Sequence, residues 1–110
     1  MKIPNADRAT IDLAKLRDYC LNPRHPRGRH KARVFQAALG LRAADATLLR
    51  DAILAVLPTV EAQSQEEDVY GRRYVADCPI DGPGGSAIVR TAWIIRPGEA
   101  SPRFVTCHVL

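Results

Sequence analysis

The sequence contains few cysteines and no long apolar run. Its 110 residues include only three cysteines, Cys20, Cys78 and Cys107, and no two of them form a CxxC pair. Because the number is odd and the spacing is wide, we expect buried thiols and neither a disulfide framework nor a zinc knuckle. No apolar stretch approaches the roughly 18 residues that span a bilayer, and the N-terminus lacks the apolar centre of a secretory signal. These absences predict a cytoplasmic protein without a membrane partner.

Motifs of the common enzyme classes are missing as well. The sequence has no GxSxG, no GxGxxG and no phosphate loop that ends in GK[ST]. No group of histidines, cysteines and carboxylates has the spacing of a metal site, and Asp77 and Asp81 flank an expected turn. We therefore expect neither a cofactor nor a metal ion.

The residues that are present predict one folded domain over residues 1–110. The hydrophobic fraction is 46%, which argues against disorder. The length fits a single core of modest size. The formal net charge is +4, which favours an anionic partner only weakly. How the charges are distributed along the chain is more informative than their sum.

The first half of the sequence has helical periodicity. Helices are predicted over residues 13–21, 30–39 and 44–57, and a short edge strand is expected over residues 6–11. Asp12 fits the N-cap of the first helix, which ends before the Asn22-Pro23 step. Gly40 fits the position after the second helix, and Pro58 follows the third.

The second half is rich in β-branched and aromatic residues. Strands are predicted over residues 68–80, 86–95 and 103–110, joined by the turn-forming stretches DGPGG and RPGEASP. Helices followed by consecutive strands indicate an α+β fold, with about three N-terminal helices packed on one face of an antiparallel sheet of three to four strands.

Alternation along the strands predicts which side chains face the helices. The expected core side comprises Val89, Thr91, Trp93, Ile95, Val105, Cys107 and Val109, packed against Leu49, Ile53 and Val56 of the third helix. The expected open face carries Arg90, Thr106 and His108. Tyr70, Arg72 and Tyr74 share a side and are assigned to the same open face, unless a bulge at Gly71 inverts the register.

The stretch NPRHPRGRHKARVF places bases where a helix is expected to begin. Residues 22–33 contain five lysines and arginines and no acid. A helix N-terminus is already partly positive, so each exposed base there costs roughly 0.3–1 kcal/mol. A bound phosphate would explain the pattern, because backbone N–H groups and cations would meet it together. The predicted phosphate-binding residues are Arg27, Gly28, Arg29 and Arg33. In the alternative interpretation, these charges are solvated or pair with Asp18, Asp45 or the acidic QEED segment.

The same segment contains groups that can catalyse phosphodiester cleavage. His25 and His30 are the expected general acid and base at neutral pH, and Lys31 would stabilise a pentacoordinate phosphate. The predicted catalytic set is His25, His30, Lys31, Arg90 and Thr106. The predicted substrate-binding residues are Tyr70, Arg72 and His108. Such groups would cleave RNA without a metal ion, with the RNA 2′-OH as the nucleophile.

Four segments resemble a known family: KLRDYCLNPRHPRGRHKARVF, YGRRYVADCPI, VRTAWIIRPGE and RFVTCHVL. They are similar to a small bacterial domain of unknown function that occurs alone and at the C-termini of polymorphic toxins. The order of helices before an antiparallel sheet also resembles the barnase–EndoU–colicin–RelE class of ribonuclease toxins. That resemblance implies an RNA-cleaving toxin with its site on the open sheet face and the loop before the second helix. A small acidic antitoxin or immunity protein would then be its cognate partner.

Two other functions are compatible with the sequence. The domain could be a binding module, such as an antitoxin, immunity or accessory protein, whose basic loop holds nucleic acid or an acidic partner without cleaving it. It could also bind a nucleotide.

Overall fold

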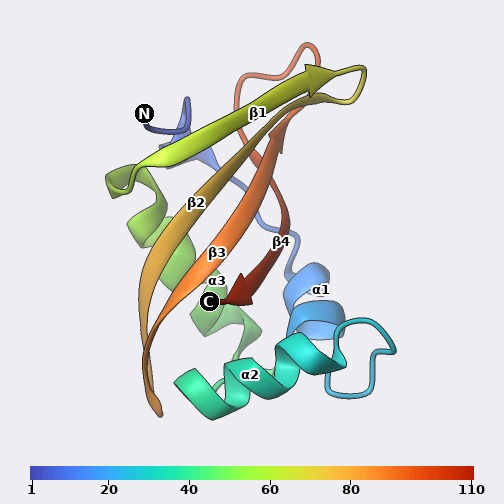
Figure 1. Ribbon diagram of the computed structural model, residues 1–110, viewed down its shortest axis with the longest axis vertical. Coiled ribbons are helices and arrows are strands. Elements are labelled where there is room, and N and C mark those ends of the chain that lie inside the picture. The colour runs from blue at the N-terminus through green and yellow to red at the C-terminus, as the bar shows by residue number, and fades with distance from the viewer.

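The computed structural model describes all 110 residues and has helices before strands (Figure 1). The helices are α1 (Leu13–Lys15), α2 (Arg29–Leu39) and α3 (Ala46–Val56). The strands are β1 (Ala62–Asp68), β2 (Gly71–Gly82), β3 (Gly85–Ile95) and β4 (Arg103–Val109). A π-helical turn, Leu16–Cys20, continues α1 to nearly the predicted end. The predicted α+β fold is confirmed.

Four antiparallel strands form one sheet in the order β1-β2-β3-β4. Figure 1 shows α3 behind the sheet, α2 across its lower end and α1 beside β4. The packing contacts join α3 to β2, and α2 to both β3 and β4, while the Leu16–Cys20 turn contacts β4. One sheet face therefore covers the core, and the other carries no helix. No helix is long and apolar enough to cross a membrane.

The core is built around Trp93, as alternation along β3 predicted. Trp93, Val89 and Thr91 are all buried. The Trp93 indole N–H donates to Thr91 Oγ1 at 2.8 Å, and the Thr91 hydroxyl donates to the carbonyl of Ala76 at 2.8 Å. The one buried polar side chain is therefore fully hydrogen-bonded, which avoids the cost of about 1–3 kcal/mol for an unpaired group.

Two local predictions in the first and third quarters of the chain are wrong. Residues 6–11 do not form a strand: Ala6–Arg8 is a 3₁₀ turn, and only Thr10 makes a single parallel bridge, to Arg103. The sheet also begins before residue 68, because residues Ala62–Asp68 form the unpredicted strand β1. All residues of β1 after Ala62 are exposed, so its polar sequence carries no alternation that would reveal a strand.

A β-bulge in β4 changes which side chains meet the helices. Ala92 pairs with Thr106, but the next residue, Trp93, pairs with Phe104, so Val105 is an extra residue. Phe104 is consequently buried against the Trp93 ring, whereas Val105 is 38% exposed. The prediction that Val105 lies in the core is wrong for this reason.

The first residues of β2 face the opposite side of the sheet from the one predicted. Tyr74 pairs with Trp93 and is buried on the helix-facing side. A turn at Val69-Tyr70 separates β1 from β2, and Gly71 has a φ of 128°. The assignment of Tyr74 to the open face is therefore wrong, and Arg72 shares its side.

Candidate functional site

His25 holds the start of α2 in place. Its Nδ1 accepts hydrogen bonds from the backbone N–H groups of Arg27 and Gly28, both at 3.0 Å, and its carbonyl accepts one from Arg29 at 2.9 Å. Its ring also packs against Tyr19, with 4.6 Å between centroids. A sequence-predicted catalytic histidine therefore serves as a loop cap, and only its Nε2 is free for other contacts.

Gly28 has a packing role at the same turn. A Cβ at this position would overlap the backbone carbonyl of Tyr19. The loop can thus lie directly on the last turn of the preceding helix only if residue 28 is glycine. This contact orders the loop and aims the side chains that follow it.

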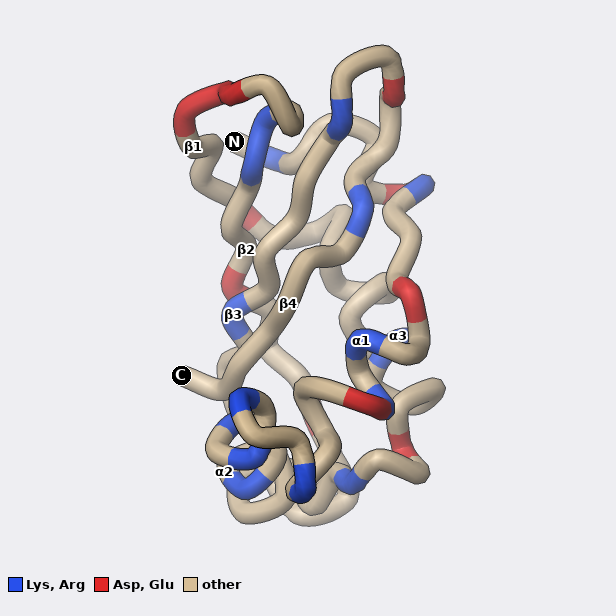
Figure 2. The backbone as a smooth tube through the Cα atoms, turned by 90° about the vertical axis from the view of Figure 1, so that its right-hand side faces the viewer, with Lys and Arg blue, Asp and Glu red and all other residues tan.

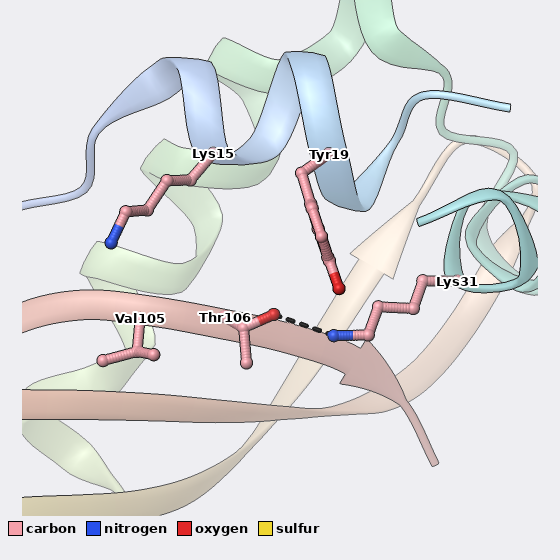
Figure 3. A pocket seen from close by; sticks show the side chains of 5 residues that line it. All are labelled: Lys15, Tyr19, Lys31, Val105 and Thr106. Carbon is pink, nitrogen blue, oxygen red and sulfur yellow. Dashed lines mark hydrogen bonds between the residues drawn. The ribbon is translucent and has the colours of Figure 1, made fainter. Parts of the chain in front are cut away.

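Lys31 reaches from α2 to the edge of β4. Its Nζ donates to Thr106 Oγ1 at 2.8 Å and lies 5.1 Å from the centre of the Tyr19 ring. Figure 3 shows the side chains of Tyr19, Lys31 and Thr106 converging from three elements. Lys31 forms no salt bridge, so no carboxylate neutralises its charge there.

These side chains line a pocket of about 310 Å³ between α1 and β4 (Figure 3). The lining residues are Lys15, Tyr19, Lys31, Val105 and Thr106. The Lys15 Nζ donates to the carbonyl of Phe104 at 3.1 Å and likewise has no carboxylate partner. Two ammonium groups without an acid make this pocket electropositive, which suits an anionic ligand.

Cys20 lies beneath the pocket. The Lys31 ammonium can only donate, so Thr106 Oγ1 accepts its hydrogen bond. The Thr106 hydroxyl is then available to donate to the Cys20 Sγ, 3.7 Å away. Hydrogen bonds from the Cys107 thiol and N–H and from Thr106, with the Lys31 charge, lower the pKa of Cys20 to about 6. Cys20 and burial raise the pKa of Cys107 well above its ordinary value. The two shifts have opposite directions, so Cys20 is the more acidic thiol of the pair.

A row of polar side chains crosses the open face beside this pocket. Asp77, Arg90 and His108 stand opposite one another on β2, β3 and β4. Arg90 donates from Nε and Nη2 to the two Asp77 carboxylate oxygens, at 2.9 and 3.0 Å. Figure 2 shows the acidic and basic segments side by side on β2 and β3. Because side chains two residues apart in a strand share a face, His108 also lies next to Thr106.

The electrostatics of this row favour an ionised acid and a neutral imidazole. The Arg90 hydrogen bonds and charge lower the pKa of Asp77. Burial, followed by the positive charges of Lys31 and Arg90, lowers the pKa of His108 below its ordinary value. At neutral pH His108 is thus an uncharged base surrounded by cations.

The basic loop has no acidic partners. Arg24, Arg27, Arg29 and Arg33 form no salt bridge, and Figure 2 shows such residues gathered around α2. The acids that the sequence offered as alternatives are engaged elsewhere. Asp18 pairs with Arg17, Asp45 accepts from the backbone of Arg42, and in the QEED segment Glu67 and Asp68 bind Arg72 and Arg73. The loop charges are therefore free.

The structure brings together part of the predicted site. Lys31 reaches Thr106 from α2, and Arg90 and His108 lie opposite each other on β3 and β4, with His108 two residues from Thr106. His30 is exposed on α2 and makes no side-chain hydrogen bond.

Two predicted substrate-binding residues lie elsewhere. Tyr70 is 68% exposed in the β1–β2 turn, and Arg72 pairs with Glu67 beside it. Arg72 is opposite Ile95, five residues along β3 from Arg90, which is roughly 17 Å.

Sequence reasoning missed four residues of this region: Lys15, Tyr19, Cys20 and Asp77. The first three lie on the last turns of a helix whose apolar pattern predicts only core packing. Asp77 was interpreted as flanking a turn because Asp81 and the turn-forming stretch DGPGG follow closely, although it lies within both the predicted strand and β2. Its place between the apolar residues Ala76 and Cys78 was the one local signal that could have placed it on the open face.

The sequence matches one protein family along nearly its whole length. Residues 2–110 match the family described as a domain of unknown function, DUF6883, and the chain belongs to this family. No curated protein and no solved structure matches the chain. The expected resemblance to a small domain of unknown function is thus confirmed, and its activity has to be argued from the site.

Proposed function

We propose that this member of the DUF6883 family is a metal-independent endoribonuclease whose site lies where the edge of β4 meets the open face. The observation that supports it best is the 2.8 Å contact of Lys31 with Thr106, which holds an unneutralised ammonium beside His108. A cation, a neutral imidazole and a guanidinium grouped around one strand can together act on a phosphodiester.

In the proposed reaction, His108 accepts the proton of an RNA 2′-OH. The resulting oxygen attacks the adjacent phosphorus, and the bond to the 5′-oxygen breaks, leaving a 2′,3′-cyclic phosphate. Lys31 and Arg90 stabilise the charge on the phosphorane oxygens. The leaving 5′-oxygen takes a proton from the Lys31 ammonium, which is held at Thr106, or from the Tyr19 hydroxyl, which points toward Lys31 (Figure 3). Every step uses a proton that the RNA or the protein supplies.

Asp77 is a positioning residue in this proposal. Its bidentate contact fixes the Arg90 guanidinium on the open face, and Arg90 retains one further nitrogen, Nη1, for a phosphate. Four arginines without a salt bridge, Arg24 and Arg27 in the loop and Arg29 and Arg33 on α2, would bind flanking phosphates, which makes affinity salt-dependent. If the domain is a toxin, we expect a small acidic antitoxin or immunity protein to bind over the same charges.

A second candidate function follows from the position of His25. Because its Nδ1 caps the loop, only His108 among the histidines lies on the row beside Lys31. With a single histidine at the site, the same basic surface would serve a binding module that holds RNA or an acidic partner without cleaving it. This alternative predicts salt-dependent binding and no cleavage products.

The test uses purified protein and total RNA in EDTA. We expect 2′,3′-cyclic phosphate ends, and a loss of about 10²–10⁴ in rate for His108→Ala, the range of general acid–base catalysis. Lys31→Ala should lower the rate strongly as well. His30→Ala is the matched control, since this exposed histidine of the same helix start has no hydrogen bond.

The histidine variants separate the possible outcomes. If His30→Ala abolishes cleavage and His108→Ala does not, the chemistry belongs to the loop, as the sequence alone predicted. Intact RNA with every protein, together with salt-dependent RNA binding, would support the binding module instead.

A further inference from the structure

A second basic pocket adjoins the first at Lys15. It has a volume of about 150 Å³ and is lined by Thr10, Asp12, Lys15, Ile94, Arg96, Arg103 and Phe104. Lys15 lines both pockets, and residues of β4 line both as well, so the two pockets adjoin each other beside β4; together they are called the path. Thr106 and Arg103 mark its two ends, roughly 10 Å apart along the strand.

The charges along this path are mostly positive and partly free. Lys15 binds only the Phe104 carbonyl, at 3.1 Å, and Arg96 forms no salt bridge. Arg103 is held by Glu99, with contacts of 2.8 and 3.0 Å to one carboxylate oxygen. The remaining acid, Asp12, accepts from the N–H of Ala14 at the start of α1. The path is therefore cationic from Lys31 to Arg96.

We propose that this path is a phosphate track for single-stranded RNA, in which Lys15 and Arg96 bind the phosphate next to the one held at Lys31. A strand held in a positively charged groove is bound through its backbone, independently of base sequence. Tyr19 lines the pocket from the helical side and Thr106 lines it from β4 (Figure 3). Its volume of about 310 Å³ is that of a small-ligand cleft, so we expect one strand to enter it and a duplex to be excluded. This inference rests on the proposed function for its choice of ligand.

Binding of an uncleavable RNA tests the track independently of cleavage. The probe is a labelled single-stranded oligonucleotide with 2′-O-methyl groups, titrated at several salt concentrations. Lys15→Met keeps the apolar stem and removes the charge, and Arg96→Ala removes a side chain that makes no hydrogen bond. Each variant should weaken binding and lower the slope of log K against log salt by about 0.7, the value for one phosphate contact on a single strand.

A matched control comes from the other side of the sheet. Arg50 on α3 pairs with Asp51, and Arg50→Ala should leave both affinity and slope unchanged. A duplex of the same sequence should bind less tightly than the single strand. Wild-type slopes for both Lys15→Met and Arg96→Ala, or equal binding of duplex and single strand, would overturn the track.

The outcomes separate this inference from the proposed ribonuclease. Reduced slopes with no cleavage of unmodified RNA would retain the track and refute the enzyme. Cleavage of unmodified RNA with unchanged slopes would refute the track and retain the enzyme.

Discussion

The structure predicts that His25 stabilises the loop before α2 and takes no part in proton transfer. His25→Ala would leave the backbone N–H groups of Arg27 and Gly28 without their acceptor, and Gly28 is buried. A buried donor without a partner costs about 1–3 kcal/mol, whereas an exposed one recovers a bond to water. We therefore expect a loss of about 1–3 kcal/mol, which lowers the melting temperature by about 4–12 °C in a domain of this size.

The substitution His25→Asn separates the capping role from a catalytic one. The asparagine Oδ1 occupies nearly the position of Nδ1 and can accept the same two hydrogen bonds, so most of the stability should return. It cannot act as a general acid or base near neutral pH. If His25 is a cap, His25→Asn cleaves RNA like the wild type at a temperature where both are folded. If it is catalytic, the rate falls by about 10²–10⁴.

The measurements are thermal unfolding followed by circular dichroism, and RNA cleavage below the melting temperature of every variant. His30→Ala, which removes an exposed histidine without a hydrogen bond, should melt like the wild type. His25 is not a cap if His25→Ala melts at the wild-type temperature, or if His25→Asn is as unstable as His25→Ala.

Three further predictions follow from single positions. Gly28→Ala should cost about 1–3 kcal/mol in urea unfolding, because the new Cβ meets the Tyr19 carbonyl; Gly98→Ala, with open space around it and a φ of 80°, should cost less. The pKa of Cys20 is about 6 in the folded protein and higher in the unfolded chain. The wild type should therefore become more stable relative to Cys20→Ser as the pH rises from about 6 toward 9. A stability difference that does not change with pH contradicts this. The cleavage rate should rise with pH and level off by neutrality, since the pKa of His108 is lowered; a rate still rising above pH 8 excludes His108 as the base.

Periodicity was sufficient to predict the elements that pack on the core. The helix expected over residues 30–39 spans Arg29–Leu39 and ends at Gly40 with a φ of 70°, as proposed. The alternation of Val89, Thr91 and Trp93 placed β3 correctly, because it is a central strand with one buried face. Local sequence is informative wherever burial alternates with the period of the element.

The candidate site depends on contacts that local sequence does not encode. Thr106 was placed on the open side correctly, but its contact with Lys31 joins residues 75 positions apart. The Val105 bulge, which no turn residue announces, turns Phe104 toward the core and leaves Val105 exposed in the pocket lining. The hydrogen-bond partners of His25 are local, only two and three residues away. The sequence around a histidine between prolines does not indicate whether its side chain caps a loop or faces a ligand.

The lysine side chains that lie along the edge of β4 stabilise the fold and also belong to the proposed binding site. An unpaired strand edge must be covered, and here the N-terminal segment covers its first part: Thr10 exchanges two backbone hydrogen bonds with Pro102 and Phe104. On either side of the bulge, lysine side chains add to this cover: Lys15 binds the Phe104 carbonyl, and Lys31 binds the Thr106 hydroxyl.

Because the groups that cover this edge are lysines, the fold concentrates positive charge along the strand whether or not a ligand binds. Loss of activity on removal of Lys31 is consequently ambiguous by itself, since the edge loses its cover at the same time. Lys31→Met keeps the apolar stem on the Tyr19 ring and removes only the charge and its hydrogen bond. If Lys31→Met melts near the wild-type temperature and still loses RNA binding, the charge acts on the ligand; if binding and stability fall together, Lys31 acts through the strand.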